Sequence, residues 1–228
     1  MSLSLPEGDG PLRRERLRTA RVYFVCDARP STDLEALLRA ALTGGADIVQ
    51  LREKELGRAE IERAAGTFRR VADTFSALFI LNDDPELARL CDADGVHVGQ
   101  DDVAAEQARE EMGPDAIVGL STHSEEQIAA SAGRPVDYIS VGPIWETPTK
   151  AGRPGVGLEL ISHAAANAPH PFFAIGGIDP SNAGEVVAAG AERLCAVRAI
   201  RDAADPEATA RDLRQAFAAG EKGRAPGG

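Results

Sequence analysis

Positively charged and amide side chains interrupt an apolar segment at residues 47–56, which reads DIVQLREKEL. The segment has strand character, and Gln50, Arg52 and Lys54 occupy alternate positions in it. Because successive strand side chains point to opposite faces, these three share one face. Two cations and an amide on one face could hold an anionic ligand, although a half-exposed strand of an antiparallel sheet has the same pattern. The positions of the other polar motifs decide between these interpretations.

Paired acidic residues follow two other apolar segments. LNDDPELA contains Asp83 and Asp84, and VHVGQDD contains Asp101 and Asp102. Neighbouring strands lie about 4.8 Å apart, so carboxylates that follow two adjacent strands can reach a common point. Magnesium suits such a pair, because it takes one or two carboxylates, keeps several waters and binds substrate phosphate oxygens. Some of these acids also fit as caps of the helices that follow, and we assign Asp83 and Asp102 to Mg²⁺.

A glycine pair and an arginine form a third group of functional candidates. AIGGIDPSN supplies Gly176 and Gly177, and CAVRAI supplies Arg198. Glycines leave room for backbone N–H groups to approach a phosphate, and a guanidinium adds a charged fork. This second anion site needs no metal, and the two sites together indicate a reaction of two substrates.

Other catalytic signatures are missing from the sequence. It contains no Walker A motif, no G-x-G-x-x-G after a strand pattern and no cluster with zinc-ligand spacing. GLSTHSEE offers Ser121 and His123, but a serine near a histidine does not make a triad, so we expect no covalent nucleophile. His97 lies inside an apolar segment and is interpreted as a hydrogen-bonded core histidine.

Eight short apolar runs rich in β-formers alternate with segments of helical composition along the 228 residues. This alternation predicts parallel βαβ units, and eight such units predict a single α/β domain, a (β/α)8 TIM barrel, rather than an open sheet. We expect the barrel over 21–220, a flexible N-terminal leader over 1–20 and a disordered tail over 221–228. The predicted strands are 22–26, 48–51, 78–81, 95–98, 116–120, 138–141, 172–175 and 194–197.

A barrel brings these motifs to one place. Barrel enzymes have their active sites where the strands end, and the loops after strands seven and eight commonly bind phosphate. The 47–56 segment ends the second strand, the aspartates follow the third and fourth, and the glycine pair follows the seventh. Polar side chains elsewhere in a parallel sheet are unfavourable, so the fold favours the functional interpretation. WETPTKAGRPGVG, after the sixth strand, is predicted to be a lid.

Composition and charge argue against several classes of function. The chain has 25 basic and 36 acidic residues, and its net charge of −11 disfavours binding to nucleic acid or anionic membranes. No apolar run approaches the roughly 20 residues of a membrane helix, and the N-terminal residues lack the apolar block of a secretory signal. Three widely separated cysteines argue against disulfides and zinc. We expect a cytoplasmic enzyme with small-molecule substrates.

The ordered motifs resemble those of the thiamine phosphate synthase family. The resemblance spans roughly residues 22–216 and rests on QLREK, ND after the third strand, GQDD, GLSTH, GPIWETPTK and IGGI. The family transfers the pyrimidine group of 4-amino-2-methyl-5-(diphosphooxymethyl)pyrimidine to the nitrogen of a thiazole phosphate, releasing pyrophosphate. The resemblance therefore implies a magnesium-dependent transferase of thiamine biosynthesis that forms a homodimer.

Residue roles carried over from the family fall on the motifs already described. The resemblance implies magnesium binding by Asp83 and Asp102. It implies catalytic roles for Arg52, Lys54, Ser121 and Lys150. The substrate-binding set that it implies is Gln50, Leu51, Arg52, Glu53, Lys54, Asn82, Ser121, Thr147, Thr149, Lys150, Gly177, Val197 and Arg198. The family usually has serine at the position of Arg198, so the phosphate pocket is expected to differ in detail there.

Two other functions remain to be compared with this one. A thiazole tautomerase of the same barrel family needs one phosphate site and no metal pair, and the retained QLREK motif argues against it. A non-catalytic sensor of a phosphorylated ligand could use the same fold, but no appended binding segment is recognisable. The sequence also leaves open whether the acceptor is the thiazole phosphate or its carboxylated form.

Overall fold

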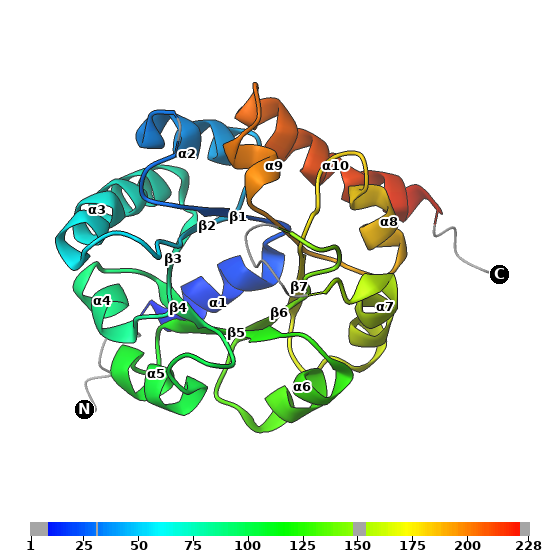
Figure 1. The fold of residues 1–228 in the computed structure, drawn as a ribbon, viewed down its shortest axis with the longest axis horizontal. Helices are drawn as coiled ribbons and strands as arrows, with labels where there is room; N and C mark the ends of the chain where they lie inside the picture. Colours follow the sequence, from blue (N-terminus) through cyan, green and yellow to red (C-terminus); the bar gives the residue numbers. More distant parts are fainter. Residues whose placement is uncertain (1–8, 31, 148–153, 224–228) are drawn as a thin grey trace, which may run out of the picture.

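Eight parallel strands close into a barrel in the computed structural model, which describes residues 9–30, 32–147 and 154–223 (Figure 1). Each strand pairs with the next one, and β1 pairs with β8 to close the sheet. The predicted (β/α)8 fold is confirmed, and each strand lies within two residues of its predicted bounds. The strands are β1 (Val22–Cys26), β2 (Ile48–Leu51), β3 (Leu78–Asn82), β4 (Gly95–Val98), β5 (Ile117–Thr122), β6 (Tyr138–Val141), β7 (Phe172–Ile175) and β8 (Leu194–Ala196).

Helices surround the barrel (Figure 1). Several begin at side-chain caps that aspartate supplies: Oδ1 of Asp33 accepts from the Ala36 amide at 2.8 Å, and Oδ1 of Asp84 from the Leu87 amide at 2.9 Å. None of the described helices is long and apolar enough to cross a membrane. The helices are α1 (Gly10–Thr19), α2 (Leu34–Thr43), α3 (Arg58–Phe75), α4 (Pro85–Leu90), α5 (Ala105–Met112), α6 (Glu125–Ala130), the 3₁₀ turn η1 (Ser131–Gly133), α7 (Gly157–Asn167), α8 (Ala183–Ala188), α9 (Arg198–Arg201) and α10 (Pro206–Gly223).

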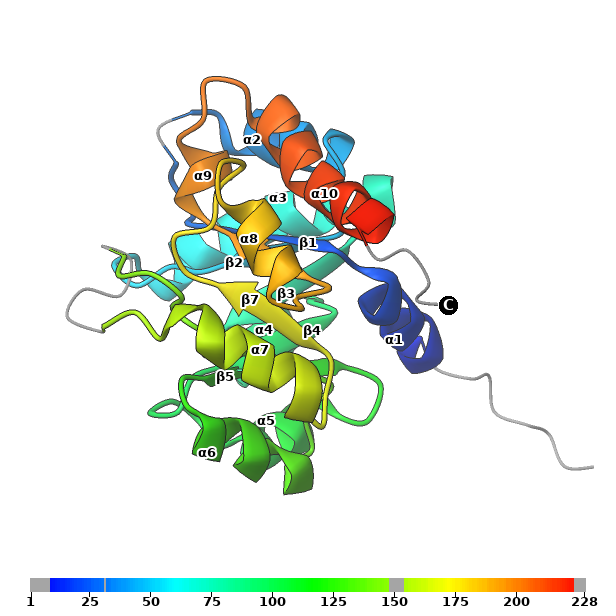
Figure 2. The same cartoon turned by 90° about the vertical axis from the view of Figure 1, so that its right-hand side faces the viewer.

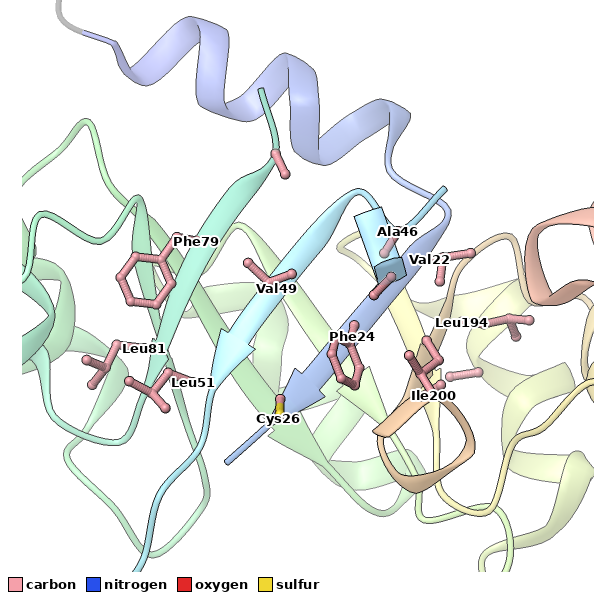
Figure 3. Close-up of a cluster of buried hydrophobic side chains, with 14 of the residues drawn as sticks. Val22, Phe24, Cys26, Ala46, Val49, Leu51, Phe79, Leu81, Leu194 and Ile200 are labelled. Carbon is pink, nitrogen blue, oxygen red and sulfur yellow. The ribbon is translucent and has the colours of Figure 1, made fainter. Parts of the chain in front are cut away.

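The core has two apolar layers, because helices cover the outer face of the sheet while strand side chains fill its lumen. Figure 3 shows the outer layer along neighbouring strands, where Phe24, Val49 and Phe79 are fully buried. Ile80 and Phe173 belong to the lumen cluster and are likewise fully buried. The strands therefore read as continuous apolar runs, and a polar side chain inside them requires a specific partner.

Helix α1 covers the N-terminal end of the barrel, opposite the loops that follow the strands (Figure 2). Its Leu17 is buried and packs with the lumen side chains. The prediction of a flexible leader over 1–20 was therefore wrong for Gly10–Thr19. Helix α1 shows little apolar periodicity in its sequence. Besides Leu17, it is held by ion pairs with residues that lie far along the chain.

Three aspartates, which we call the aspartate trio, immediately precede β2, β4 and β6: Asp47, Asp94 and Asp137. Each accepts backbone N–H groups where a neighbouring strand begins; Asp94 Oδ2, for example, accepts from the Phe79 amide at 2.9 Å. Each is also paired with arginine, so the strand starts are fixed by charge-assisted hydrogen bonds. The ion pairs are Arg214–Asp47, Arg13–Asp94, Arg69–Asp94, Arg14–Asp137 and Arg109–Asp137.

The C-terminal tail is shorter than predicted. Helix α10 continues to Gly223, so the disordered tail predicted over 221–228 was wrong for residues 221–223. Residues 224–228 lie outside the described residues.

Candidate active site

A pocket occupies the barrel mouth, where the strands end. Its walls come from the strand ends and the loops that follow them, as expected for a barrel enzyme. The lining residues are Val25, Gln50, Arg52, Asn82, His97, Ser121, His123, Ser140, Gly142, Pro143, Thr147, Ile175, Gly176, Gly177, Ile178, Asp179, Cys195, Val197, Arg198 and Ala199. The structure thus brings together eight of the predicted site residues: Gln50, Arg52, Asn82, Ser121, Thr147, Gly177, Val197 and Arg198.

Two residues of the predicted set have other surroundings. Leu51 is 1% exposed and packs in the outer apolar layer between sheet and helices. Glu53 turns its carboxylate back onto the chain and accepts from the amides of Ala28, Lys54 and Glu55 at 3.3, 2.8 and 2.8 Å. Burial opposes ionisation of Glu53, but these backbone donors outweigh it and lower its pKa. Glu53 therefore shapes the loop that carries Lys54.

An acidic pair and a lysine meet at the edge of this pocket. Lys54 Nζ contacts Asp83 Oδ2, and Asp102 lies within hydrogen-bonding reach of Asp83. Burial raises the pKa of Asp83, the Asp102 carboxylate adds to this, and Lys54 opposes it. Asp83 is held in place because its amide donates to the His97 carbonyl at 2.8 Å, and its backbone has a φ of 68°. The predicted proximity of Asp83 and Asp102 is thus found in the structure.

The chemistry of this pair fits a hard divalent cation. In the described parts of the chain, no group of three or more His, Cys, Asp or Glu side chains is arranged to hold a metal. Two adjacent carboxylates would leave the remaining coordination positions to water and substrate oxygens, which is the usual arrangement for Mg²⁺. Asp84, by contrast, caps α4, as the sequence allowed.

A chain of hydrogen bonds links several strands inside the barrel. Gln50 Nε2 donates to Tyr23 Oη at 2.7 Å, and Tyr23 Oη lies 2.9 Å from Tyr138 Oη. Tyr138 Oη lies 3.0 Å from Nδ1 of His97, whose Nε2 lies 3.0 Å from Ser121 Oγ. Burial raises the pKa of both tyrosines, so both hydroxyls keep their protons. His97 is the satisfied core histidine that was predicted.

The two tyrosines were not singled out from the sequence. They are the only tyrosines in the chain, and both stand at strand positions. Their hydroxyl groups on otherwise apolar strands could have indicated buried hydrogen bonds, because a buried hydroxyl needs a partner. The sequence does not show which partner it finds, since Tyr23 and Tyr138 are 115 residues apart.

The other side of the pocket is glycine-rich. Gly176 has φ 109° and Gly177 has φ 71°, a region that glycine enters without strain. A Cβ at Gly176 would lie 2.4 Å from Pro143 Cα, and one at Gly177 3.1 Å from Trp145 Cβ. The loop after β7 therefore packs closely against the loop after β6, and Arg198 at the start of α9 completes this side.

Two of the predicted site residues, Thr149 and Lys150, lie outside the described residues. The middle of the predicted lid, 148–153, lies outside them as well. Thr147, just before this stretch, is buried and lines the pocket.

Known proteins with similar sequences and structures identify the family of this barrel. The family model described as "Thiamine monophosphate synthase" matches residues 22–200. A thiamine-phosphate synthase of Thermus thermophilus is 46% identical over 199 residues, covering 86% of this chain and 96% of the relative. That of Acidothermus cellulolyticus is 45% identical over 206 residues, covering 89% and 97%. The solved thiamine phosphate pyrophosphorylase of Pyrococcus furiosus is 31% identical, with a TM-score of 0.80, covering 92% and 98% of the two chains.

The closed barrel, with a glycine-rich loop and paired carboxylates where its strands end, has the architecture of a barrel enzyme. The chain belongs to the thiamine monophosphate synthase family. The resemblance inferred from the ordered motifs is confirmed. These three relatives bear the names of a synthase or a pyrophosphorylase, and none of the three is named as a tautomerase or a sensor.

Proposed function

We propose that this protein is a thiamine phosphate synthase: it transfers the pyrimidine group of 4-amino-2-methyl-5-(diphosphooxymethyl)pyrimidine to the nitrogen of a thiazole phosphate and releases pyrophosphate. Family membership supports this activity. The observation that carries it is that the barrel mouth has Arg52 and the Lys54–Asp83–Asp102 cluster on one side and Gly177 with Arg198 on the other, and we assign one anion to each side.

The diphosphate end is assigned to the first of these sites. When the carbon–oxygen bond breaks, negative charge develops on pyrophosphate, and positioned cations stabilise it without any protein nucleophile. Arg52 lines the pocket, and Lys54, two residues further along, contacts Asp83. Mg²⁺ held by Asp83 and Asp102 would neutralise further charge on the diphosphate. Occupation of Asp83 by the cation would release Lys54 toward the leaving group, and Lys150 is proposed as a further cation.

The pyrimidine ring is assigned to the pocket floor. Gln50, Asn82 and Ser121 come from three strands and present an amide, a second amide and a hydroxyl to the cavity. These groups suit an aminopyrimidine, which offers both donors and acceptors around its ring. Holding the ring flat beside Arg52 also keeps the carbon that is attacked in line with the leaving group.

The thiazole phosphate is assigned to the glycine-rich side. Thr147, Gly177, Val197 and Arg198 line that side, and Thr149 is proposed to join them. A guanidinium in place of the family's usual serine holds the phosphate by charge as well as by hydrogen bonds. We expect this to favour a more highly charged acceptor, and measuring kcat/KM for the thiazole phosphate and for its carboxylated form tests the preference.

The segment 145–157 is proposed to close over the two substrates and keep water from the pyrimidine cation. Hydrogen exchange of residues 146–157 is expected to slow when both substrates are bound. Exchange that stays the same with and without substrates would contradict the lid. A cytoplasmic homodimer is also proposed, on the family resemblance alone, and light scattering of the purified protein measures its mass.

The activity itself is tested by pyrophosphate release from purified protein. Release is expected only with both substrates and Mg²⁺, and it should stop after chelation or after either substrate is left out. Magnesium-independent conversion of a single thiazole phosphate would instead identify a tautomerase. Saturable binding of thiazole phosphate without turnover of any substrate pair would identify a sensor.

A further inference from the structure

The lumen of the barrel contains a continuous line of hydrogen bonds in an otherwise apolar interior. It runs from Gln50 through Tyr23, Tyr138 and His97 to Ser121, with successive separations of 2.7, 2.9, 3.0 and 3.0 Å. Both of its ends, Gln50 and Ser121, line the pocket. The middle of the line lies deeper, where Tyr138 is fully buried and Tyr23 is 2% exposed.

The surrounding residues make room for this line. Phe173 packs edge-on against Tyr23 and Tyr138, with ring centroids 5.2 and 5.4 Å away, so purely apolar rings are already accommodated at this level of the lumen. Gly119 clears the space beside the phenol, because a Cβ there would lie 2.2 Å from Tyr138 Cζ. Buried hydroxyls are unfavourable without partners. A lumen that holds two of them in one line, joined at both ends to pocket residues, points to a role in the pocket.

The line has a direction, which follows from the donors that each group possesses. Gln50 donates its amide hydrogen to Tyr23. Each buried phenol hydrogen then has an acceptor if Tyr23 donates to Tyr138 and Tyr138 donates to Nδ1 of His97, which is the direction we assign. The imidazole proton then lies on Nε2 and is donated to Ser121. Ser140 Oγ also donates to Ser121 Oγ, at 3.5 Å. Ser121 therefore accepts from inside the barrel, and its own hydrogen is directed to the pocket.

We propose that Tyr23, Tyr138 and His97 are positioning residues that set the hydrogen-bond polarity of the pyrimidine site. Because the Gln50 nitrogen is held by Tyr23, its carbonyl oxygen is presented to the cavity as an acceptor. Because Ser121 is held by His97, its hydroxyl is presented as a donor. The site thus offers one fixed acceptor and one fixed donor to an amino-substituted heteroaromatic ring. This inference rests on the proposed function for the identity of that ring.

Tyr138→Phe tests the proposal, because it keeps the ring and removes one hydroxyl from the middle of the line. Thr122→Val is the matched control: Thr122 is also fully buried, and its hydroxyl donates to the Ser140 carbonyl at 2.9 Å outside the line. Steady-state kinetics would be measured with each substrate varied in turn. Histidine ¹⁵N chemical shifts would report the tautomer of His97 in the wild type and in both variants.

In Tyr138→Phe, KM for the pyrimidine diphosphate is expected to rise about tenfold, which corresponds to about 1.4 kcal/mol. KM for the thiazole phosphate should stay within twofold. His97 should carry its proton on Nε2 in the wild type and Thr122→Val, and should lose this preference in Tyr138→Phe. Tyr23→Phe removes the hydroxyl between Gln50 and Tyr138 and should also raise KM for the pyrimidine diphosphate. This variant replaces Tyr138→Phe in the test if Tyr138→Phe does not fold.

Several results would overturn the proposal. A wild-type His97 with its proton on Nδ1 would show that the line runs the other way. Tyr138→Phe and Thr122→Val with equal kinetic constants would show that the lumen hydroxyls only stabilise the barrel. Wild-type protein that releases no pyrophosphate would instead contradict the proposed function, while the His97 tautomer and the direct binding of the pyrimidine diphosphate would still test the line.

Discussion

The two ends of the barrel handle charge differently. At the N-terminal end, each member of the aspartate trio is paired with at least one arginine and accepts backbone N–H groups as well. At the mouth, Arg52 and Arg198 line the pocket, and neither forms an ion pair with any residue that the structure describes. Asp83 pairs there with Lys54 and lies beside a second carboxylate, that of Asp102. The described carboxylates at the N-terminal end are thus neutralised by arginines of the fold, whereas Arg52 and Arg198 at the mouth face the pocket.

Removing a carboxylate at the mouth should have the largest effect on activity. Asp102→Ala takes away half of the proposed cation site, and we expect kcat/KM to fall by about 10²–10³-fold, as for other groups that stabilise developing charge. Binding of thiazole phosphate, measured by calorimetry, should stay nearly unchanged, because that site uses Gly177 and Arg198. Equal loss of both properties would contradict the separation of the two sites.

Removing a carboxylate at the other end should have the opposite outcome. Asp94→Ala removes the carboxylate that Arg13, Arg69 and the Phe79 amide share. We expect the free energy of unfolding to fall by about 3 kcal/mol, measured by urea denaturation, since breaking a largely buried pair strands its partners. At temperatures where the variant is folded, kcat/KM should stay within twofold. A large kinetic defect there would break the contrast between the ends.

Glycines with positive φ offer a finer comparison of the same two ends. Gly177→Ala forces a side chain into a left-handed backbone beside Trp145, so KM for the thiazole phosphate is expected to rise about tenfold. Gly113→Ala imposes similar strain before β5 begins, at the N-terminal end, where a Cβ meets no atom within 4 Å. It should lower stability by about 1–3 kcal/mol without changing KM. Equal KM values in the two variants would count against the assigned phosphate loop.

The smallest expected effect concerns the loop that holds Lys54. The folded-state pKa of Glu53 is lowered, so its ionised carboxylate contributes stability above its unfolded pKa, and this contribution is lost as pH falls through the folded pKa. Glu53→Gln should therefore be less stable than wild type at pH 7 by less than about 1 kcal/mol, and the difference should shrink below about pH 4. Urea denaturation at several pH values measures this; a difference that grew in acid would have the wrong sign.

Most of the barrel and eight of the residues that line the pocket could be predicted from the sequence, because both depend on local patterns. Apolar runs set the strands, and the fold then brings their ends together, so Gln50 and Ser121 could be placed in one site without any contact information. Asp84 could be recognised as a cap candidate from its position before a helix. These inferences need only spacing and one fold-level rule.

The features that were missed depend on contacts between distant residues. Helix α1 has few apolar residues, and its anchors Asp94 and Asp137 are 81 and 123 residues from Arg13 and Arg14. The lumen hydrogen bonds join Tyr23 to Tyr138 across the barrel in the same way. Glu53 was assigned to the substrate because it lies in a functional motif, but its carboxylate turns back to the Ala28 amide. Spacing along one strand does not predict such choices of partner.

The position of α1 also determines when it can dock during synthesis. Arg13 and Arg14 leave the ribosome long before Asp94 and Asp137 exist, since chains emerge from the N-terminus. The helix therefore cannot complete these contacts until the start of β6 has been made. Completed docking of α1 would therefore follow the synthesis of β1 to β5. A fluorescent probe on α1 would report when the N-terminal end of the nascent barrel becomes covered.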